Sequence, residues 1–151
     1  MKLEAGQVAV VTGAANGIGR AVAAALVDRG LRVVAADVET ETLARTAAGL
    51  GDPVLAVPTD VADIDQVRAL ADRTLVPFGR VDLVVNNAGV GAGGPSWGEM
   101  AKEMLPTARA AEIVLAAVEA GKLYETTHPV MAHAARERIE TILESFGASA
   151  A

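Results

Sequence analysis

Short apolar segments alternate with helix-like segments along the first half of the chain. Strands rich in Val and Ala, buried on both faces, are predicted at residues 7–12, 32–37, 54–57 and 81–85. Helices are predicted from apolar spacing at residues 18–29, 39–50 and 64–75. Gly30 is placed to end the first helix, Asp63 to cap the third, and Pro77 and Gly79 to stop it. This order predicts an α/β fold, a Rossmann-like doubly wound parallel sheet with helices on both faces.

A glycine-rich turn follows the first predicted strand, with glycines at positions 13, 17 and 19. Gly13 is expected to allow a sharp exit from the strand, Gly17 to let backbone N–H groups approach a pyrophosphate, and Gly19 to let the helix pack closely on the sheet. The helix N-terminus then presents its partial positive charge to the phosphates, with Asn16 and Ile18 in the same site. A plain tight turn is the alternative for this spacing taken alone.

Asp37 ends the second predicted strand, at the usual distance from Gly13 for the acidic residue of a dinucleotide site. A carboxylate there can accept both hydroxyls of an adenosine ribose. It would repel a 2′-phosphate, and neither Ala15 nor its neighbour Val38 supplies a compensating cation. We therefore expect NAD in preference to NADP, with Val38 in the site. A solvated loop acid is the alternative for Asp37.

Two further motifs follow the third and fourth predicted strands: Asp60-Val61, and Asn-Asn-Ala-Gly at residues 86–89. With the glycine turn and Asp37, they resemble the short-chain dehydrogenase/reductase family in order and spacing. The resemblance implies hydride transfer between NAD and an alcohol or carbonyl. It also implies that Asp60 and Val61 meet the adenine, and that Asn87, Ala88 and Gly89 run past the ribose on the nicotinamide side. The alternative for Asn86 and Asn87 is that they cap backbone groups around the turn.

The resemblance continues at residues 104–146 with the C-terminal end of the family. We expect one domain over residues 1–151, with a cofactor-binding half at 1–90, a glycine-rich linker at 91–103 and a helix–strand–helix unit at 104–147. The elements of this unit are predicted at residues 107–120, 123–127 and 131–146. The fold is thus expected to be truncated relative to the family.

The segment that carries the family's chemistry is missing between these two parts. The resemblance implies a Ser that orients the substrate and a Tyr-x-x-x-Lys whose Tyr transfers a proton to or from the substrate oxygen. Tyr124 is the single Tyr of the chain, and His128 stands four residues later in place of Lys. We therefore predict no catalytic residue. No metal site is predicted either, because His128 and His133 are off the spacing of a helical metal pair.

The composition of the chain excludes some kinds of binding partner. The net charge of −6 leaves no basic patch for nucleic acid or an anionic membrane, and the absence of Cys excludes disulfides and thiolate metal sites.

With 32 Ala and four aromatic residues, the core must form from small aliphatic side chains in close backbone contact. No run is long enough to span a membrane and the N-terminus lacks an apolar signal region, so a cytoplasmic protein is expected. Relative to the family, the fourth strand loses its usual neighbour, so either residues 123–127 pair beside it in the same chain or a second chain covers its edge, and a homo-oligomer is expected.

Three functions therefore compete. The first is a short-chain oxidoreductase, probed by turnover of secondary alcohols. The second is an NAD-binding module or pseudo-enzyme without catalysis, favoured by the missing Ser, Tyr and Lys. The third is a structural or interaction protein with a relic glycine turn, which NAD binding would exclude. The residues favour an NAD-binding chain with impaired catalysis.

Overall fold

The computed structural model describes residues 2–89 and 105–122. The four strands are β1 (Val8–Thr12), β2 (Arg32–Asp37), β3 (Val54–Pro58) and β4 (Leu83–Val85). The helices are α1 (Gly17–Asp28), α2 (Thr40–Leu50), α3 (Ile64–Phe78) and α5 (Thr107–Glu119). The predicted linker at 91–103, strand at 123–127 and helix at 131–146 lie outside the described residues.

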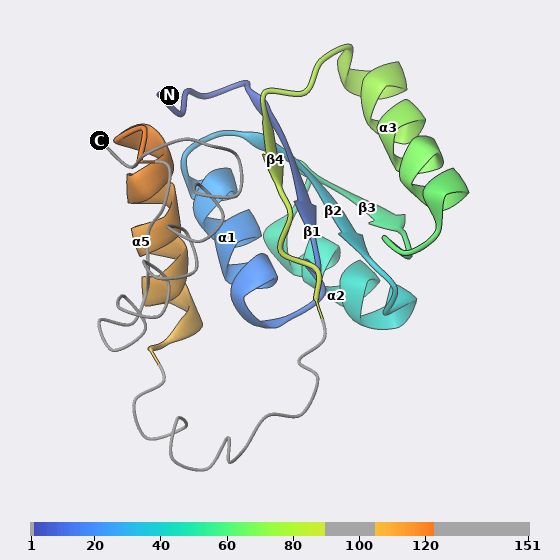
Figure 1. Cartoon of the computed structure of the whole chain (residues 1–151), viewed down its shortest axis with the longest axis horizontal. Coiled ribbons are helices and arrows are strands. Elements are labelled where there is room, and N and C mark those ends of the chain that lie inside the picture. The colour runs from blue at the N-terminus through green and yellow to red at the C-terminus, as the bar shows by residue number, and fades with distance from the viewer. Residues whose placement is uncertain (1, 90–104, 123–151) are drawn as a thin grey trace, which may run out of the picture.

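The four strands form one parallel sheet in the order β3-β2-β1-β4 (Figure 1). The predicted doubly wound parallel sheet is confirmed. β1 pairs with both β2 and β4, so that Val10 lies opposite Val34 on one side and Val84 on the other. The chain runs outward from β1 to β3 and then returns to the opposite side of β1. Open α/β sheets bind ligands at such a switch point, outside the carboxyl ends of the strands.

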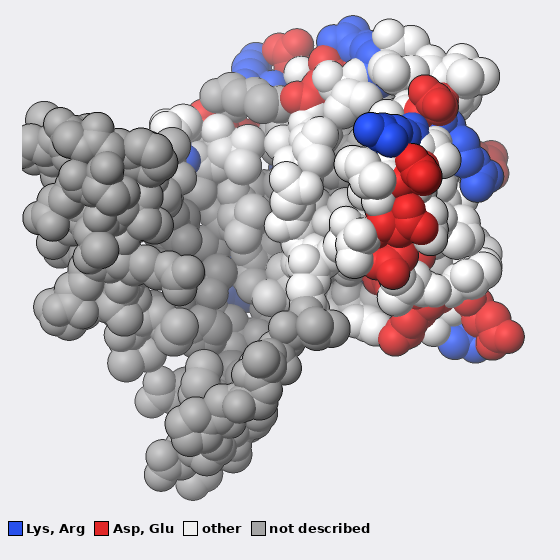
Figure 2. Space-filling view, turned by 45° about the vertical axis from the view of Figure 1, so that its right-hand side comes forward, with Lys and Arg blue, Asp and Glu red and all other residues white. Residues whose placement is uncertain are grey.

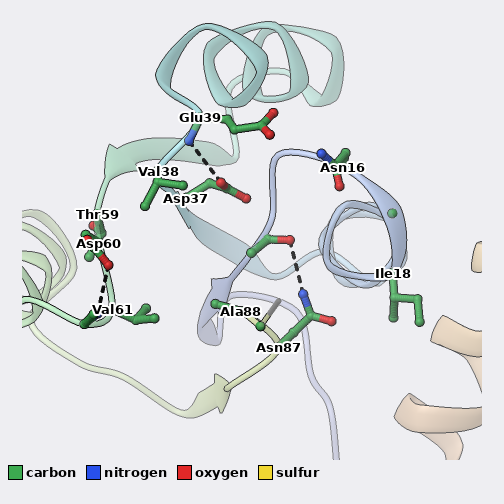
Figure 3. A pocket seen from close by; sticks show the side chains of 14 residues that line it. Asn16, Ile18, Asp37, Val38, Glu39, Thr59, Asp60, Val61, Asn87 and Ala88 are labelled. Carbon is green, nitrogen blue, oxygen red and sulfur yellow. Dashed lines mark hydrogen bonds between the residues drawn. The ribbon is translucent and has the colours of Figure 1, made fainter. Parts of the chain in front are cut away.

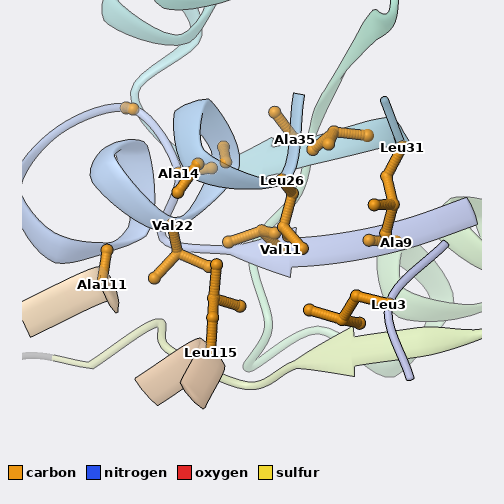
Figure 4. Close-up of a cluster of buried hydrophobic side chains, with 14 of the residues drawn as sticks. Leu3, Ala9, Val11, Ala14, Val22, Leu26, Leu31, Ala35, Ala111 and Leu115 are labelled. Carbon is orange, nitrogen blue, oxygen red and sulfur yellow. The ribbon is translucent and has the colours of Figure 1, made fainter. Parts of the chain in front are cut away.

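Helices cover both faces of the sheet, as predicted. On one face, alternate strand residues pack against α1, α2 and α5 in the larger hydrophobic cluster (Figure 4). Val22 and Leu26 of α1 and Leu115 of α5 are almost fully buried there, and each such side chain contributes about 2 kcal/mol of burial free energy. On the other face, Leu70 and Phe78 of α3 pack on a smaller cluster. The Ala-rich core expected from composition is therefore present, with α5 close against α1.

Two predicted boundaries are wrong. β4 begins at Leu83 and not at Val81, because Asp82 uses its side chain as well as its backbone to pair with β1. Its carboxylate accepts a hydrogen bond from the Val8 N–H at 2.8 Å, while its own N–H donates to the Val8 carbonyl at 2.8 Å.

Pro77 does not stop α3. A proline at this position removes the hydrogen bond of its own N–H and crowds the carbonyl four residues earlier, yet the helix continues for one more residue to Phe78, which packs on the core. The helix ends at Gly79, whose left-handed backbone (φ 69°) suits a C-cap, as predicted. Elsewhere the predicted boundaries agree with the structure to within one or two residues.

In Figure 2, acidic side chains run down the described part of the surface, with basic ones near its edges and a broad uncharged area beside them. Among residues 2–89 and 105–122, no helix has the length and apolar character that a membrane span needs. β4 is the edge strand of the described sheet, and Val84 is 53% exposed on it.

The Asp82 contacts predict that the interaction between β1 and β4 weakens in acid. Hydrogen bonds from the Arg80 guanidinium and the Val8 N–H lower the pKa of Asp82. A lowered pKa in the folded state means that the stabilisation is complete above the unfolded pKa of about 4 and is lost as the pH falls through the folded pKa. Asp82→Asn should therefore lower the Tm at pH 7, and the difference from wild type should be smaller at pH 2.

Circular dichroism melts at both pH values measure this difference. Asp52→Asn is the matched control, because Asp52 is exposed and no side-chain hydrogen bond joins it to the described residues. A Tm difference for Asp82→Asn that stays constant with pH would contradict the assignment.

Candidate functional site

A pocket of about 600 Å³ opens at the carboxyl ends of the strands, a size typical of ligand sites (Figure 3). Its walls are the four segments that follow β1, β2, β3 and β4. Eleven of the twelve predicted site residues line it: Gly13, Asn16, Gly17, Ile18, Asp37, Val38, Asp60, Val61, Asn87, Ala88 and Gly89. The structure thus brings together residues that are up to 76 positions apart in the sequence.

Gly19 is the predicted residue that does not line the pocket. It lies beneath the turn, where an added Cβ would overlap the carbonyl oxygen of Gly13 and the side-chain amide of Asn87. Gly13 is also confined, because a Cβ there would come within 2.8 Å of the Asn87 amide and 2.9 Å of the Ala88 backbone. Gly13 and Gly17 both have positive φ, 65° and 57°. These glycines let α1 begin directly against the ends of β1 and β4.

The N-terminus of α1 opens on the pocket without a side-chain cap. Asn16 holds the N-cap position in an extended conformation and makes no capping hydrogen bond, and the first turn contains no acidic residue. The N-terminus of α3 differs, because Asp63 caps the N–H groups of Asp65 and Gln66. The side-chain hydrogen bond from Gln66, followed by these backbone bonds, lowers the pKa of Asp63. Nothing lies within 4 Å of a Cβ added at Gly17, so the approach to the α1 N-terminus is open.

Asp37 is not a freely solvated loop acid. One carboxylate oxygen accepts a hydrogen bond from the Ala15 N–H at 2.9 Å, and the other accepts one from the Glu39 N–H at 3.0 Å. The carboxylate is therefore fixed in place between the glycine turn and the start of α2. Each carboxylate oxygen can accept a further hydrogen bond, so two acceptors remain for a ligand.

The Asn87 side chain caps backbone groups, which is the alternative that the sequence left open. Its amide nitrogen donates to the carbonyls of Thr12 and Gly13 at 3.0 and 3.1 Å. The Thr12 hydroxyl accepts from the N–H groups of Asn87 and Ala88, both at 3.0 Å, and donates to the Val85 carbonyl. These bonds hold the loop after β4 against the glycine turn, and Asn87 still lines the pocket.

The segment after β3 is held in the same way. The Asp60 carboxylate accepts from the Ala62 N–H at 2.9 Å, and its own N–H donates to the Gln66 side chain at 2.9 Å. Val61 is 47% exposed and Val38 is 62% exposed, and the two lie toward the same side of the pocket in Figure 3. They contribute exposed apolar surface to the lining of the pocket.

Sequence reasoning missed three lining residues: Glu39, Thr59 and Ala62. The signal for Glu39 was present, because residues two apart in extended backbone share a face, and Glu39 follows Asp37 at that spacing. With Glu39, the lining contains three carboxylates, from Asp37, Glu39 and Asp60, and no Lys or Arg among the described residues.

Other candidates of the sequence analysis lie outside the described residues, namely Tyr124, His128 and His133. Within the residues that the structure does describe, no group of three or more His, Cys, Asp and Glu side chains is placed to hold a metal ion.

The comparison with protein families agrees with this geometry. The model of the short chain dehydrogenase family matches residues 7–135. The chain belongs to the short-chain dehydrogenase family. It is 49% identical over 86 residues to cis-4-hydroxycyclohexanecarboxylate dehydrogenase of Sinomonas cyclohexanicum, which is 56% of this chain and 34% of that protein. It is 47% identical over 88 residues to D-threitol dehydrogenase of Mycolicibacterium smegmatis, again 56% of this chain and 34% of that protein. The aligned part is thus about a third of these relatives' length.

Solved structures of short-chain dehydrogenases share the fold. One from Burkholderia phymatum, in complex with NAD, has a TM-score of 0.60 and 40% identity, covering 79% of this chain and 44% of that one. The 3-ketoacyl-(acyl-carrier-protein) reductase from Brucella melitensis, complexed with NADH, has a TM-score of 0.59 and 31% identity, covering 78% and 50%. Both similar structures hold a nicotinamide dinucleotide.

The glycine packing predicts opposite effects of two Gly→Ala substitutions. Gly19→Ala should lower the free energy of unfolding by about 1–3 kcal/mol, because the new methyl group overlaps the glycine turn. Gly49→Ala is the matched control in α2, where nothing lies within 4 Å, and it should raise the free energy of unfolding by up to about 1 kcal/mol. Urea titrations measure both. Equal effects of the two substitutions would contradict the packing described here.

Proposed function

We propose that this chain binds NAD(H) in the pocket at the carboxyl ends of the strands. The adenosine ribose binds to Asp37, the adenine lies by Val38, Asp60 and Val61, and the pyrophosphate lies on the 13–19 turn. Asn87, Ala88 and Gly89 run past the nicotinamide ribose. The observation that carries this proposal is the convergence of these four segments on one pocket at the switch point of the sheet.

The pocket's hydrogen-bonding groups fit such a ligand. Asp37 keeps one free acceptor position on each oxygen, which matches two ribose hydroxyls. The uncapped N-terminus of α1 supplies N–H donors and a partial positive charge for a pyrophosphate. The two solved relatives with NAD and NADH support a nicotinamide dinucleotide as the cofactor.

The charges of the pocket support NAD over NADP. A 2′-phosphate would meet the carboxylates of Asp37 and Glu39, and no cationic side chain lines the described pocket. Like charges at close range repel strongly where water is partly excluded. The neutral 2′-hydroxyl of NAD avoids this repulsion.

Asp37→Ala should weaken NADH binding about tenfold or more and reduce the preference for NADH over NADPH, because it removes the ribose acceptor and one repelling charge. Glu39→Gln is the matched comparison. It keeps the backbone N–H that holds Asp37, so NADH affinity should stay near wild type while NADPH affinity rises.

Calorimetric titrations with both cofactors measure these affinities, and circular dichroism checks the fold of each variant. Unchanged affinity of Asp37→Ala for both cofactors would remove Asp37 from the site. Unchanged NADPH affinity in Glu39→Gln would show that Glu39 does not contribute to the preference for NADH over NADPH.

We also propose that this chain is catalytically impaired. The family is one of oxidoreductases, but the Ser and the Tyr-x-x-x-Lys implied by the resemblance are absent from this sequence, whose single Tyr is followed four residues later by His. Hydride transfer to or from an alcohol needs a group that takes or gives the hydroxyl proton. A panel of secondary alcohols should therefore give no NAD reduction above background, as followed by absorbance at saturating NAD. Clear turnover would contradict this proposal.

The homo-oligomer expected from the sequence stays a prediction. It is supported by the exposure of Val84 on β4, the edge strand of the described sheet. Light scattering after size-exclusion chromatography measures the mass in solution, and a monomer at micromolar concentration would contradict it.

A further inference from the structure

Thr46, in the interior of α2, makes an unusual hydrogen bond for a helical threonine. Its hydroxyl donates to the carbonyl of Ala15 in the glycine turn at 2.7 Å, across 31 positions of sequence, and the residue is 5% exposed. A threonine within a helix commonly donates to the carbonyl four residues earlier. Thr74 of α3 does so: its hydroxyl donates to the Leu70 carbonyl at 2.7 Å, and it is also buried, at 0% exposed. Two buried threonines of the same chain thus differ in their hydrogen-bond acceptor, which for Thr74 lies in its own helix and for Thr46 lies in the glycine turn.

Both backbone polar groups of Ala15, the residue that Thr46 contacts, make hydrogen bonds. Its N–H donates to the Asp37 carboxylate at 2.9 Å, while its carbonyl accepts from Thr46. Ala15 is 1% exposed, so losing either bond would leave a buried polar group unsatisfied. Gly13 and Gly17, which flank this segment, both have positive φ and lack side chains. The conformation of the turn therefore depends on bonds from outside it.

The Thr46 bond also orients the next peptide group. The Ala15 carbonyl and the Asn16 N–H belong to one trans peptide and point in opposite directions, since the described chain contains no cis peptide bond. With the carbonyl turned toward α2, the Asn16 N–H is turned away from it. Asn16 lines the pocket, and its N–H makes no hydrogen bond with any part of the chain that the structure describes.

We propose that Thr46 is a positioning residue for the dinucleotide site: it sets the Ala15–Asn16 peptide and thereby the groups that the glycine turn presents. It touches no ligand and acts through Ala15, on the ribose acceptor Asp37 and on the N–H groups at the start of α1. This inference rests on the proposed function for its ligand, NADH, and on hydrogen bonds of the free protein for its geometry.

Thr46→Val keeps the shape of the side chain and removes the donor, while Thr46→Ser keeps the donor. Thr74→Val is the matched control, because it removes a buried hydroxyl bond that lies within α3. Calorimetry should show NADH and ADP binding about tenfold weaker in Thr46→Val, and within twofold of wild type in Thr46→Ser and Thr74→Val. Loss of stability alone would lower the Tm of both valine variants without separating their affinities.

Amide hydrogen exchange of the ligand-free protein separates this inference from the proposed function. The Ala15 N–H should exchange about tenfold faster or more in Thr46→Val, and at the wild-type rate in Thr46→Ser and Thr74→Val. Unchanged Ala15 exchange in a folded Thr46→Val would overturn the positioning role, as would unchanged affinity in that variant if the wild type binds NADH. Wild-type protein that does not bind NADH would overturn the proposed function, while faster Ala15 exchange would still support the role of Thr46 in the turn.

Discussion

Gly19 lies close against Gly13, and this contact sets how α1, the end of β1 and the loop after β4 meet. Because neither residue has a side chain, α1 starts directly against the end of β1, and the loop after β4 lies against both. Thr12 and Asn87 then join the three segments through hydrogen bonds of 3.0–3.3 Å. A methyl group at either glycine would push these segments apart. The pocket can form here because the segments beneath it meet through backbone atoms.

The charges around the pocket explain how an acidic protein could bind an anionic ligand. Its lining carries the carboxylates of Asp37, Glu39 and Asp60, so the side chains favour hydroxyl and amino groups. Favourable interaction with phosphates must come from backbone N–H groups. Those at the start of α1 are available because the Asn16 side chain does not cap them. In the proposed function, hydroxyl recognition and phosphate recognition therefore fall to different parts of the site, and both depend on the same turn.

Much of this arrangement could be predicted from the sequence, because it follows from local patterns. Apolar runs such as residues 32–37 predict buried strands, and the chain order then places Asp37 and Asp60 at one edge of the sheet. Side-chain partners were not predictable in this way. The hydrogen bond of Thr46 to Ala15 and that of Asp82 with Val8 join residues that are 31 and 74 positions apart. Capping of the turn by Asn87 was expected only as an alternative, without its two acceptors, the carbonyls of Thr12 and Gly13. Spacing in one segment carries no information about the direction of a side chain in another.

In the proposed function, the glycine turn and the ends of β2, β3 and β4 form one dinucleotide site. Two-dimensional amide NMR of the ¹⁵N-labelled chain during titration with NADH tests it most directly. Saturable shifts are expected at residues 13–19, 37–39, 59–62 and 87–89, with α3 outside its first turn unaffected. Shifts centred on α3 and β4 with the glycine turn unchanged, or no shifts at millimolar NADH, would contradict it.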